Sequence, residues 1–219
     1  CKGGNFLMAH RGNAGFTAFS KILLPLFRII YNPKLVIEHP IPEEGAIIIC
    51  SNHKHVMDQC MAAIATKRPI NYMAKAEYFK GPFAWFFRAT GCICVNRNGH
   101  DSEAKSEATE VLSKGGALGL FPEGTRNRTD NLMGEFKYGA ASLACKNNAK
   151  IIPVAVTGDY KFRSKNLMSR IGTPISTEGR TVEEVNTLLK KEIASLISKN
   201  LEEGCGTEAE YERIKRYQI

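Results

Sequence analysis

Two short apolar runs, each stopped by polar or turn-forming residues, constrain the fold of this chain most strongly. Residues 46–50 have the sequence AIIIC and are followed by Ser51 and Asn52, and the run at residues 117–121 is stopped by Pro122. Short apolar runs that are rich in β-branched residues and end at turn formers are typical of buried strands. Polar side chains that follow two such strands are expected to line a cleft at one edge of an α/β sheet.

The first polar cluster, residues 52–58 (NHKHVMD), combines a base with a carboxylate. Helix-forming residues at 57–66 place Asp58 in the first turn of a helix. Because five residues of a regular helix turn through about 140°, His53 and Asp58 can face each other only if His53 lies in the turn before that helix. A neutral imidazole can then accept a hydroxyl proton, while the carboxylate fixes its tautomer and stabilises the imidazolium.

Two other interpretations of this cluster stay open. A histidine that follows a strand can simply cap a turn. His53, His55 and Asp58 are also all metal-ligand types, so a metal-dependent hydrolase is an alternative function. However, a lysine separates the two histidines, and no further His or Cys stands at ligand spacing nearby. We therefore expect neither a metal nor a cofactor.

The second cluster, residues 121–126 (FPEGTR), suits an anionic ligand. Gly124 allows close approach of the backbone, and Arg126 can grip a phosphate through two parallel hydrogen bonds. A hydrogen bond to a charged group contributes roughly 1.5 to 3 kcal/mol. A surface turn with an ion pair between Glu123 and Arg126 is the alternative interpretation.

Four motifs in this order resemble the motif series of the glycerolipid acyltransferases. They are His53-(four residues)-Asp58 after Asn52, residues 91–97 (GCICVNR), residues 121–126 (FPEGTR) and residues 152–154 (IPV). The resemblance covers roughly residues 33–175, with shorter matches at 73–79 and 136–141. It is strongest to the bacterial 1-acyl-glycerol-3-phosphate (lysophosphatidate) acyltransferases.

The resemblance implies acyl transfer without an acyl-enzyme intermediate. His53 would be the general base on the free hydroxyl of lysophosphatidate, and Asp58 would orient it. The hydroxyl would attack the thioester of acyl-coenzyme A or an acyl carrier protein, giving phosphatidic acid for phospholipid synthesis. Glycerol-3-phosphate or another lyso-lipid is the alternative acceptor, because these motifs do not reveal the headgroup.

The resemblance also implies a set of substrate-binding residues. These are Arg97, Glu123, Gly124, Thr125, Arg126 and Pro153. The two arginines would hold the acceptor phosphate, residues 123–125 would shape the acceptor pocket, and Pro153 would lie in a strand that borders the donor site. Lys75 and Lys137 could contact either phosphates or solvent, and solvent is the favoured interpretation.

The composition fits one α/β domain with acidic partners. The chain has 219 residues, 43% of them hydrophobic, which is enough to bury a core. Its formal net charge of +8 favours anionic ligands or surfaces. Its aromatic residues do not alternate with basic ones, so no nucleic-acid partner is expected. Seven cysteines without regular spacing indicate reduced thiols rather than a disulfide framework.

Residues 15–32 are predicted to form an amphipathic helix at a membrane surface. One arc of the helix carries Phe16, Phe19, Ile22, Leu23, Leu26, Phe27 and Ile30, and the other carries Thr17, Lys21 and Arg28. The segment is too short and too charged to span a bilayer, and Pro25 is expected to bend it. Packing of the same stripe on the core is the alternative. Since the implied acyl donors are cytosolic, we expect a peripheral enzyme on the cytoplasmic face of the cell membrane.

The remaining pattern predicts an α/β catalytic domain at residues 33–200 with a central mixed sheet flanked by helices. Strands are expected at 35–38, 70–74 and 151–157 with a short edge at 172–175, and helices at 101–112, 136–146 and 181–199. Thr181 is expected to cap the last helix. Residues 1–14, which begin with Cys1, are expected to be an extension left by expression or clipping. Residues 201–219 are expected to be a charged tail with a solvated helix.

Overall fold

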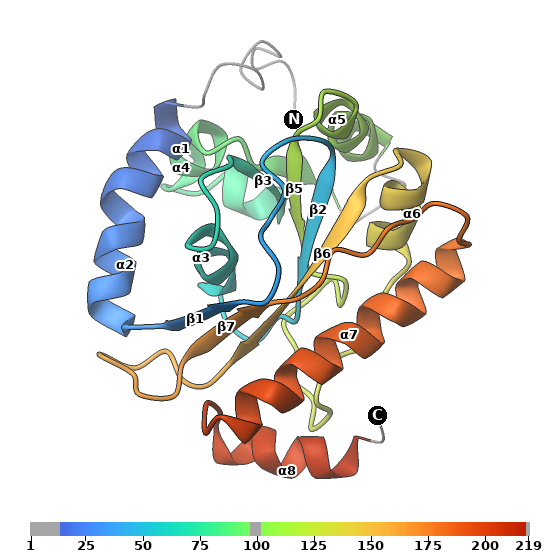
Figure 1. Cartoon of the computed structure of the whole chain (residues 1–219). Helices are drawn as coiled ribbons and strands as arrows, with labels where there is room; N and C mark the ends of the chain where they lie inside the picture. The colour runs from blue at the N-terminus through green and yellow to red at the C-terminus, as the bar shows by residue number, and fades with distance from the viewer. Residues whose placement is uncertain (1–13, 97–101, 218–219) are drawn as a thin grey trace.

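The computed structural model describes residues 14–96 and 102–217. A mixed sheet of seven strands lies at the centre of this part of the protein (Figure 1). The strands are β1 (Lys34–Ile37), β2 (Ile47–Ser51), β3 (Ile70–Lys75), β4 (Ile93–Val95), β5 (Ala117–Leu120), β6 (Lys150–Thr157) and β7 (Met168–Ile171). The helices are α1 (Ala14–Ala18), α2 (Leu24–Tyr31), α3 (Asp58–Ala63), α4 (Ala84–Ala89), α5 (Ser102–Ser113), α6 (Gly139–Lys146), α7 (Val182–Glu202) and α8 (Glu208–Arg216). A π-helical turn, η1 (Phe19–Leu23), joins α1 to α2, and a 3-10 helix, η2 (Ala76–Phe79), follows β3.

Parallel pairing of the central strands brings the two polar motifs to the same edge of the sheet. The strand order is β1-β7-β6-β2-β5-β3-β4. β2 is parallel to β5 and β6, and its register places Cys50 beside Leu120. His53 and the residues after Leu120 therefore leave the sheet side by side. Because β7 is antiparallel to β6, the predicted mixed sheet is confirmed.

Helices cover both faces of the sheet, and the side chains of β2 alternate between them. Ile48 and Cys50 belong to a core with α5, α6 and α7, whereas Ile47 and Ile49 belong to a second core with α2 and α3 (Figure 1). All four side chains are at most 1% exposed. Burial on both faces explains why this strand is an unbroken apolar run.

The apolar pattern does not predict β7, because its centre contains Ser169 and Arg170. Arg170 is nevertheless only 5% exposed. Its guanidinium donates to Asn200 at 2.8 Å and to Glu38 at 3.1 Å, and it also pairs with Glu203. A buried charge is tolerated where its donors are paired in this way. The partners of Arg170 come from the ends of β1 and α7, so no local sequence pattern predicts this strand.

Proline stands in β6 at an irregular step of the strand pairing. Central strands rarely contain proline, because it has no N–H to donate. Val154 lies opposite Ile171 in β7, whereas Ile151 forms a bridge with Ile175. Between these two pairs the opposite segment has one more residue than β6. Pro153 lies in that interval, where regular pairing is already interrupted.

The C-terminal residues form the expected helix, α8, and most of it is exposed, but one side packs on the domain. The side chain of Glu210 in α8 is buried and forms an ion pair with Lys54. The hydroxyl of Tyr211 donates to the carbonyl of Leu201 at 2.8 Å. α8 therefore joins the end of α7 to the loop that carries His53.

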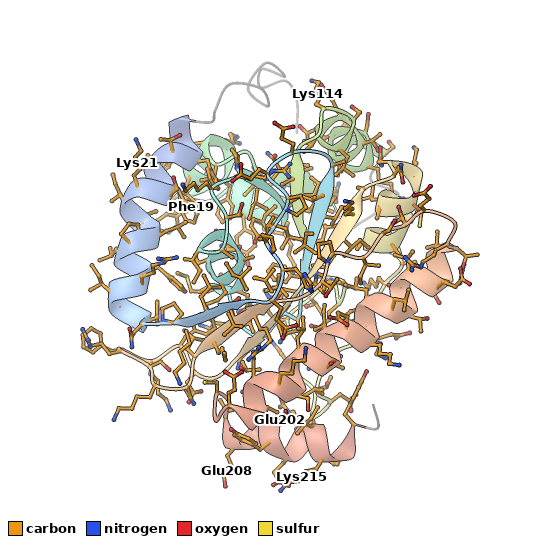
Figure 2. All side chains as sticks on the ribbon, viewed as in Figure 1. Phe19, Lys21, Lys114, Glu202, Glu208 and Lys215 are labelled. Carbon is orange, nitrogen blue, oxygen red and sulfur yellow. The ribbon has the colours of Figure 1, made fainter. Side chains whose placement is uncertain are left out.

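The N-terminal segment is helical, but its predicted apolar stripe divides between two sides. Phe16 and Phe27 are 5% and 3% exposed, whereas Ile22 from the same predicted arc is 65% exposed. The π-helical turn contains one more residue than an α-helical turn and shifts the following side chains around the axis. Figure 2 shows Phe19 on the inner side of the segment and Lys21 on the outer side. No helix within residues 14–96 and 102–217 is long and apolar enough to cross a membrane.

Candidate active site

His53 and Asp58 form a hydrogen-bonded pair at the carboxyl end of β2. His53 follows the strand, Asp58 is the first residue of α3, and Nδ1 of the imidazole lies 2.9 Å from Oδ2 of the carboxylate. An ionised carboxylate can only accept, so Nδ1 carries the proton and Nε2 keeps a free lone pair. The Asp58 side chain is fully buried, and the His53 side chain is 18% exposed. The pair can therefore take a proton from a ligand that reaches Nε2.

Asp58 is held by four donors. Its Oδ2 accepts the Nδ1–H of His53 and the backbone N–H groups of Lys54 and His55, both at 2.7 Å. Its Oδ1 accepts the hydroxyl of Tyr160 at 2.6 Å. Tyr160 lies 102 positions away in the loop between β6 and β7, and nothing in the local sequence indicated its involvement.

The FPEGTR loop holds the backbone of His53 on both sides. The N–H of His53 donates to Oε1 of Glu123 at 2.7 Å, and the N–H of Asn127 donates to the carbonyl of His53 at 2.7 Å. Oε2 of Glu123 accepts the N–H of Gly134 at 2.6 Å. Burial raises the pKa of Glu123, although these N–H groups counteract the effect. Both carboxylate oxygens thus bind backbone groups, which joins the loop to the base.

An aromatic stack supports the imidazole. The ring of His53 lies on Phe121 with a centroid distance of 3.9 Å and an interplanar angle of 14°, and Phe121 stacks in turn on Tyr72 at 6.0 Å. Gly119 makes room for this arrangement, because a Cβ there would lie 2.3 Å from the Tyr72 ring. The ring orientation of His53 is therefore fixed by packing as well as by Asp58.

Arg126 and Lys137 place two cations at the FPEGTR loop. Arg126 makes no hydrogen bond or ion pair with any residue that the structure describes, so the alternative ion pair with Glu123 is not formed. Burial lowers the pKa of His55, and the charge of Arg126 lowers it further. The side chain of Lys137 lies over Gly124, where an added Cβ would be 3.3 Å from Nζ. Lys137 is exposed, and its side chain lies beside the FPEGTR loop.

The other predicted site residues are not gathered around His53 in the same way. Thr125 is exposed on the loop, and Pro153 is buried inside β6 opposite Cys50. Arg97 lies outside the described residues. The His55 ring stacks on Tyr160 with a centroid distance of 4.3 Å. Within the described ranges, no group of three or more His, Cys, Asp or Glu side chains could hold a metal ion.

An apolar pocket lies between the N-terminal segment and the sheet, next to this site. It is lined by Phe16, Phe19, Gln59, Ala63, Ile70, Tyr72, Phe86, Phe87, Thr90 and Cys92. Gln59 directly follows Asp58, and Tyr72 stacks on Phe121 beneath the imidazole. Nearly all of the lining is apolar or aromatic, but the volume of about 30 Å³ is too small for a fatty acyl chain unless the lining moves.

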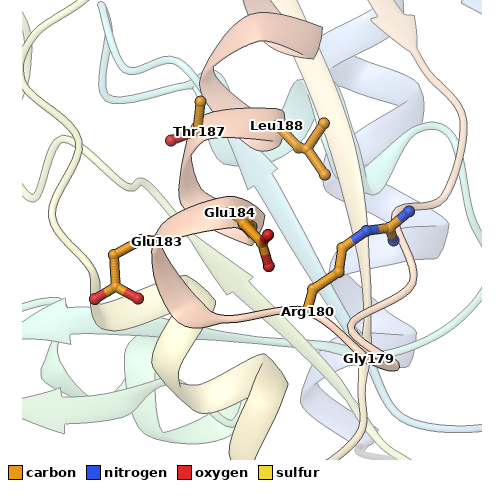
Figure 3. A pocket seen from close by; sticks show the side chains of 6 residues that line it. All are labelled: Gly179, Arg180, Glu183, Glu184, Thr187 and Leu188. Atoms are coloured by element: carbon orange, nitrogen blue, oxygen red, sulfur yellow. The ribbon is translucent and has the colours of Figure 1, made fainter.

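A second hollow lies far from this chemistry. It is formed by residues 179–188 at the start of α7 (Figure 3). Thr177, just before it, contacts the carbonyl of Ala149 at the start of β6, which is the opposite edge of the sheet from His53. Glu184 is already used there to close the N-terminal cap of α7 with Thr181. The hollow is therefore separate from the candidate site.

Curated relatives of the chain carry one recurring name. A 1-acyl-sn-glycerol-3-phosphate acyltransferase from Borreliella burgdorferi is 31% identical over 161 residues, covering 72% of this chain and 64% of that protein. The protein of the same name from Saccharomyces cerevisiae is 30% identical over 176 residues, covering 72% of this chain and 56% of that protein. The chain thus spans less than two thirds of the length of these relatives.

A solved structure has a similar fold. The crystal structure of the 1-acyl-sn-glycerophosphate (LPA) acyltransferase PlsC from Thermotoga maritima superposes with a TM-score of 0.62, covering 83% of this chain and 82% of that chain at 22% identity. The family model described as Acyltransferase matches residues 32–157. The match covers more than half of the chain and includes the two motifs that meet at His53, so the protein belongs to the acyltransferase family.

Proposed function

We propose that the protein transfers a fatty acyl group from an acyl thioester to the free hydroxyl of 1-acyl-glycerol-3-phosphate, giving phosphatidic acid. The observation that carries the proposal is the 2.9 Å contact between Nδ1 of His53 and Asp58, which leaves Nε2 available to take a proton. The names of the relatives support lysophosphatidate as the acceptor.

In this reaction His53 acts as a general base and then as a general acid. Nε2 takes the proton of the acceptor hydroxyl while the oxygen attacks the thioester carbonyl. The tetrahedral intermediate then expels the thiolate, which receives the same proton from the imidazolium. Asp58 stabilises the imidazolium and holds the tautomer. Because the acceptor supplies the nucleophile, no acyl-enzyme forms.

The oxyanion of that intermediate needs hydrogen-bond donors. The N–H groups of His53, Lys54 and His55 donate to Glu123 and Asp58, so they are already engaged. We therefore propose that the donors to the oxyanion come from the loop that follows Phe121 rather than from the N–H groups of residues 53–55.

Charge at the mouth of the site suits the acceptor phosphate. Arg126 and Lys137 supply two cations next to Gly124, and we propose Arg97 as a third. The two carboxylate oxygens of Glu123 accept backbone N–H groups of His53 and Gly134. We propose that Glu123 positions His53, while Gly124 and Thr125 border the acceptor.

We propose that the acyl chain of the donor enters between the apolar side chains beside Tyr72, which move apart to admit it. The thioester carbonyl would then lie near the His53 ring, because Tyr72 and His53 both stack on Phe121. Acyl-coenzyme A and an acyl carrier protein both supply such a chain. Pro153 would affect the donor site only indirectly, through its effect on the shape of β6.

A membrane surface is the proposed location of the acceptor. Exposed apolar side chains extend from α2 to α4 and the loop after β6: Ile22, Leu26, Ile29, Phe83, Trp85 and Phe162. The N–H of Arg163 donates to the carbonyl of Ile30 at 2.6 Å, which places this loop next to α2. Lys21, Lys161 and Arg163 add positive charge to the same region. We propose that residues 15–32 lie on the cytoplasmic face of the membrane and that residues 33–217 form the catalytic domain.

The decisive experiment measures release of free thiol from each donor across a panel of acceptors, with a chelator present. Lysophosphatidate should react fastest, glycerol-3-phosphate and a phosphate-free lyso-lipid more slowly. His53→Ala should lower kcat by roughly 10² to 10⁴, whereas His55→Ala should have a smaller effect. Thiol release that needs no acceptor, or that the chelator abolishes, would favour the metal-dependent hydrolase instead.

A further inference from the structure

Tyr160 contacts the proposed catalytic pair from a distant part of the chain. Its hydroxyl donates to Oδ1 of Asp58 at 2.6 Å, while His53 uses Oδ2 of the same carboxylate. The side chain of Asp58 is completely buried. Each carboxylate oxygen is therefore satisfied from a different side, and water has no access to either.

We infer that Tyr160 is a positioning residue for acyl transfer, which fixes the orientation and charge distribution of Asp58 and thereby tunes the basicity of His53. The inference rests on the proposed role of the His53–Asp58 pair. It adds a residue that neither motif contains.

Contacts with two neighbouring rings fix the orientation of the Tyr160 ring and therefore the direction of its hydroxyl. It stacks on His55 at 4.3 Å and 23°, and it meets the Tyr31 ring edge-on at 5.6 Å. Burial raises the pKa of Tyr160 well above its ordinary value, and the charge of Asp58 raises it further. The phenol thus keeps its proton and acts as a donor throughout the working pH range.

The loop that carries Tyr160 is anchored to the same segment that holds Asp58. Lys54, whose N–H binds Asp58, reaches with Nζ to the carbonyl of Gly158 at 2.5 Å. The N–H of Gly158 donates to Glu210 in α8 at 2.9 Å. Gly158 has φ +87°, and a Cβ there would lie 2.0 Å from a backbone oxygen of Asn166, so the turn requires glycine. Contacts with the Lys54 segment and with α8 therefore fix the position of the loop that carries the Tyr160 hydroxyl.

Removing this hydroxyl has two physical consequences. The hydrogen bond draws negative charge toward Oδ1, so its loss leaves more charge on Oδ2 and favours the imidazolium form of His53. The carboxylate also loses a restraint, so the pair is less well ordered for proton transfer. The titratable and charged groups that surround the pair are His53, Lys54, His55, Cys60, Tyr72, Glu123, Arg126 and Tyr31.

The test compares Tyr160→Phe with Tyr31→Phe. Both variants keep an aromatic ring in the same cluster, and the Tyr31 hydroxyl makes no hydrogen bond with any described residue. Tyr160→Phe should lower kcat about ten-fold to one hundred-fold and change the acceptor KM less. The acid limb of its pH profile of kcat/KM should move to higher pH by roughly 0.5 to 1 unit. Tyr31→Phe should leave the profile unchanged.

Three results would overturn the inference. Wild-type kcat and pH profile in Tyr160→Phe would exclude a positioning role. Equal losses in the two variants, with an unshifted profile, would indicate ring packing alone. The inference would also fail if Tyr160→Phe had a lower melting temperature and the fraction of unfolded protein accounted for the lost activity. Full activity of His53→Ala would instead reject the proposed role of the pair, so the two failures are distinguishable.

Discussion

Replacing Ile22 and Ile29 by serine tests whether the outer side of the N-terminal segment binds lipid. The two side chains are 65% and 64% exposed, so the replacements remove little packing from the fold. Full burial of an isoleucine side chain contributes about 1.5 to 3 kcal/mol. About two thirds of each side chain can still be buried in a membrane, which amounts to roughly 2 to 4 kcal/mol for the pair. Vesicle affinity should therefore fall roughly 30-fold to several hundred-fold.

The measurement is a titration of the protein with sedimenting vesicles that contain an anionic phospholipid. Leu188→Ser is a matched control, because Leu188 is 39% exposed but lies on α7, away from the proposed membrane side. Neither replacement changes the charge, so the salt dependence of binding should persist. The reasoning is refuted if the double variant binds as the wild type does, or if the control loses as much affinity.

Deleting the whole N-terminal segment would not separate the two roles of its side chains. Phe16, Leu24 and Phe27 are at most 7% exposed and pack in the core. Removal of three buried side chains of this size costs several kcal/mol, comparable with the whole stability of a domain. The deleted protein is therefore expected to unfold, whereas the serine variants keep the core intact.

Three further variants test the site. Arg126→Lys should lower kcat/KM for lysophosphatidate more than for a phosphate-free acceptor, because an ammonium cannot reproduce a two-point contact; equal losses would make the residue structural or donor-binding. In Glu123→Gln the amide oxygen can accept only one of the two backbone N–H groups. The free energy of unfolding should therefore fall by about 1 to 3 kcal/mol, and kcat should fall as well. The control Glu135→Gln, at an exposed position, should change neither quantity. Glu210→Gln breaks the ion pair with Lys54 and should lower both the free energy of unfolding and kcat. Glu208→Gln, on the exposed side of α8, should lower neither. Unchanged activity of Glu210→Gln would show that α8 does not support the site.

Local patterns in the chain were sufficient to predict the strands that build the site. Residues 46–50 and 117–121 correspond closely to β2 (Ile47–Ser51) and β5 (Ala117–Leu120). The predicted cap of α7 is also confirmed, since the Thr181 side chain accepts the N–H of Glu184. Apolar runs and caps depend on neighbouring residues, so they can be recognised without knowledge of the fold.

The helical stripe of residues 15–32 shows where periodicity fails. A regular spacing of 3.6 residues assigns Phe16, Ile22 and Phe27 to one arc. The π-helical turn at Phe19–Leu23 rotates the following residues, and the structure buries Phe16 and Phe27 while it exposes Ile22. Packing on the core, one of the two interpretations that the sequence left open, therefore describes part of the segment, and membrane binding by the exposed part stays a prediction.

The residues around the motifs depend on the order of strands in the sheet. Asp58 meets Tyr160 across 102 positions, and Lys54 meets Glu210 across 156 positions. No window of sequence contains both members of either pair. His53 and Asp58, in contrast, are five residues apart, and a single turn before α3 is enough to bring them together. The chemistry of the base can thus be predicted from the sequence. The groups that hold the base in place are brought together by the pairing of β6 with β2 and by the ion pair between α8 and the loop after β2, because long-range contacts follow from topology and not from local propensity.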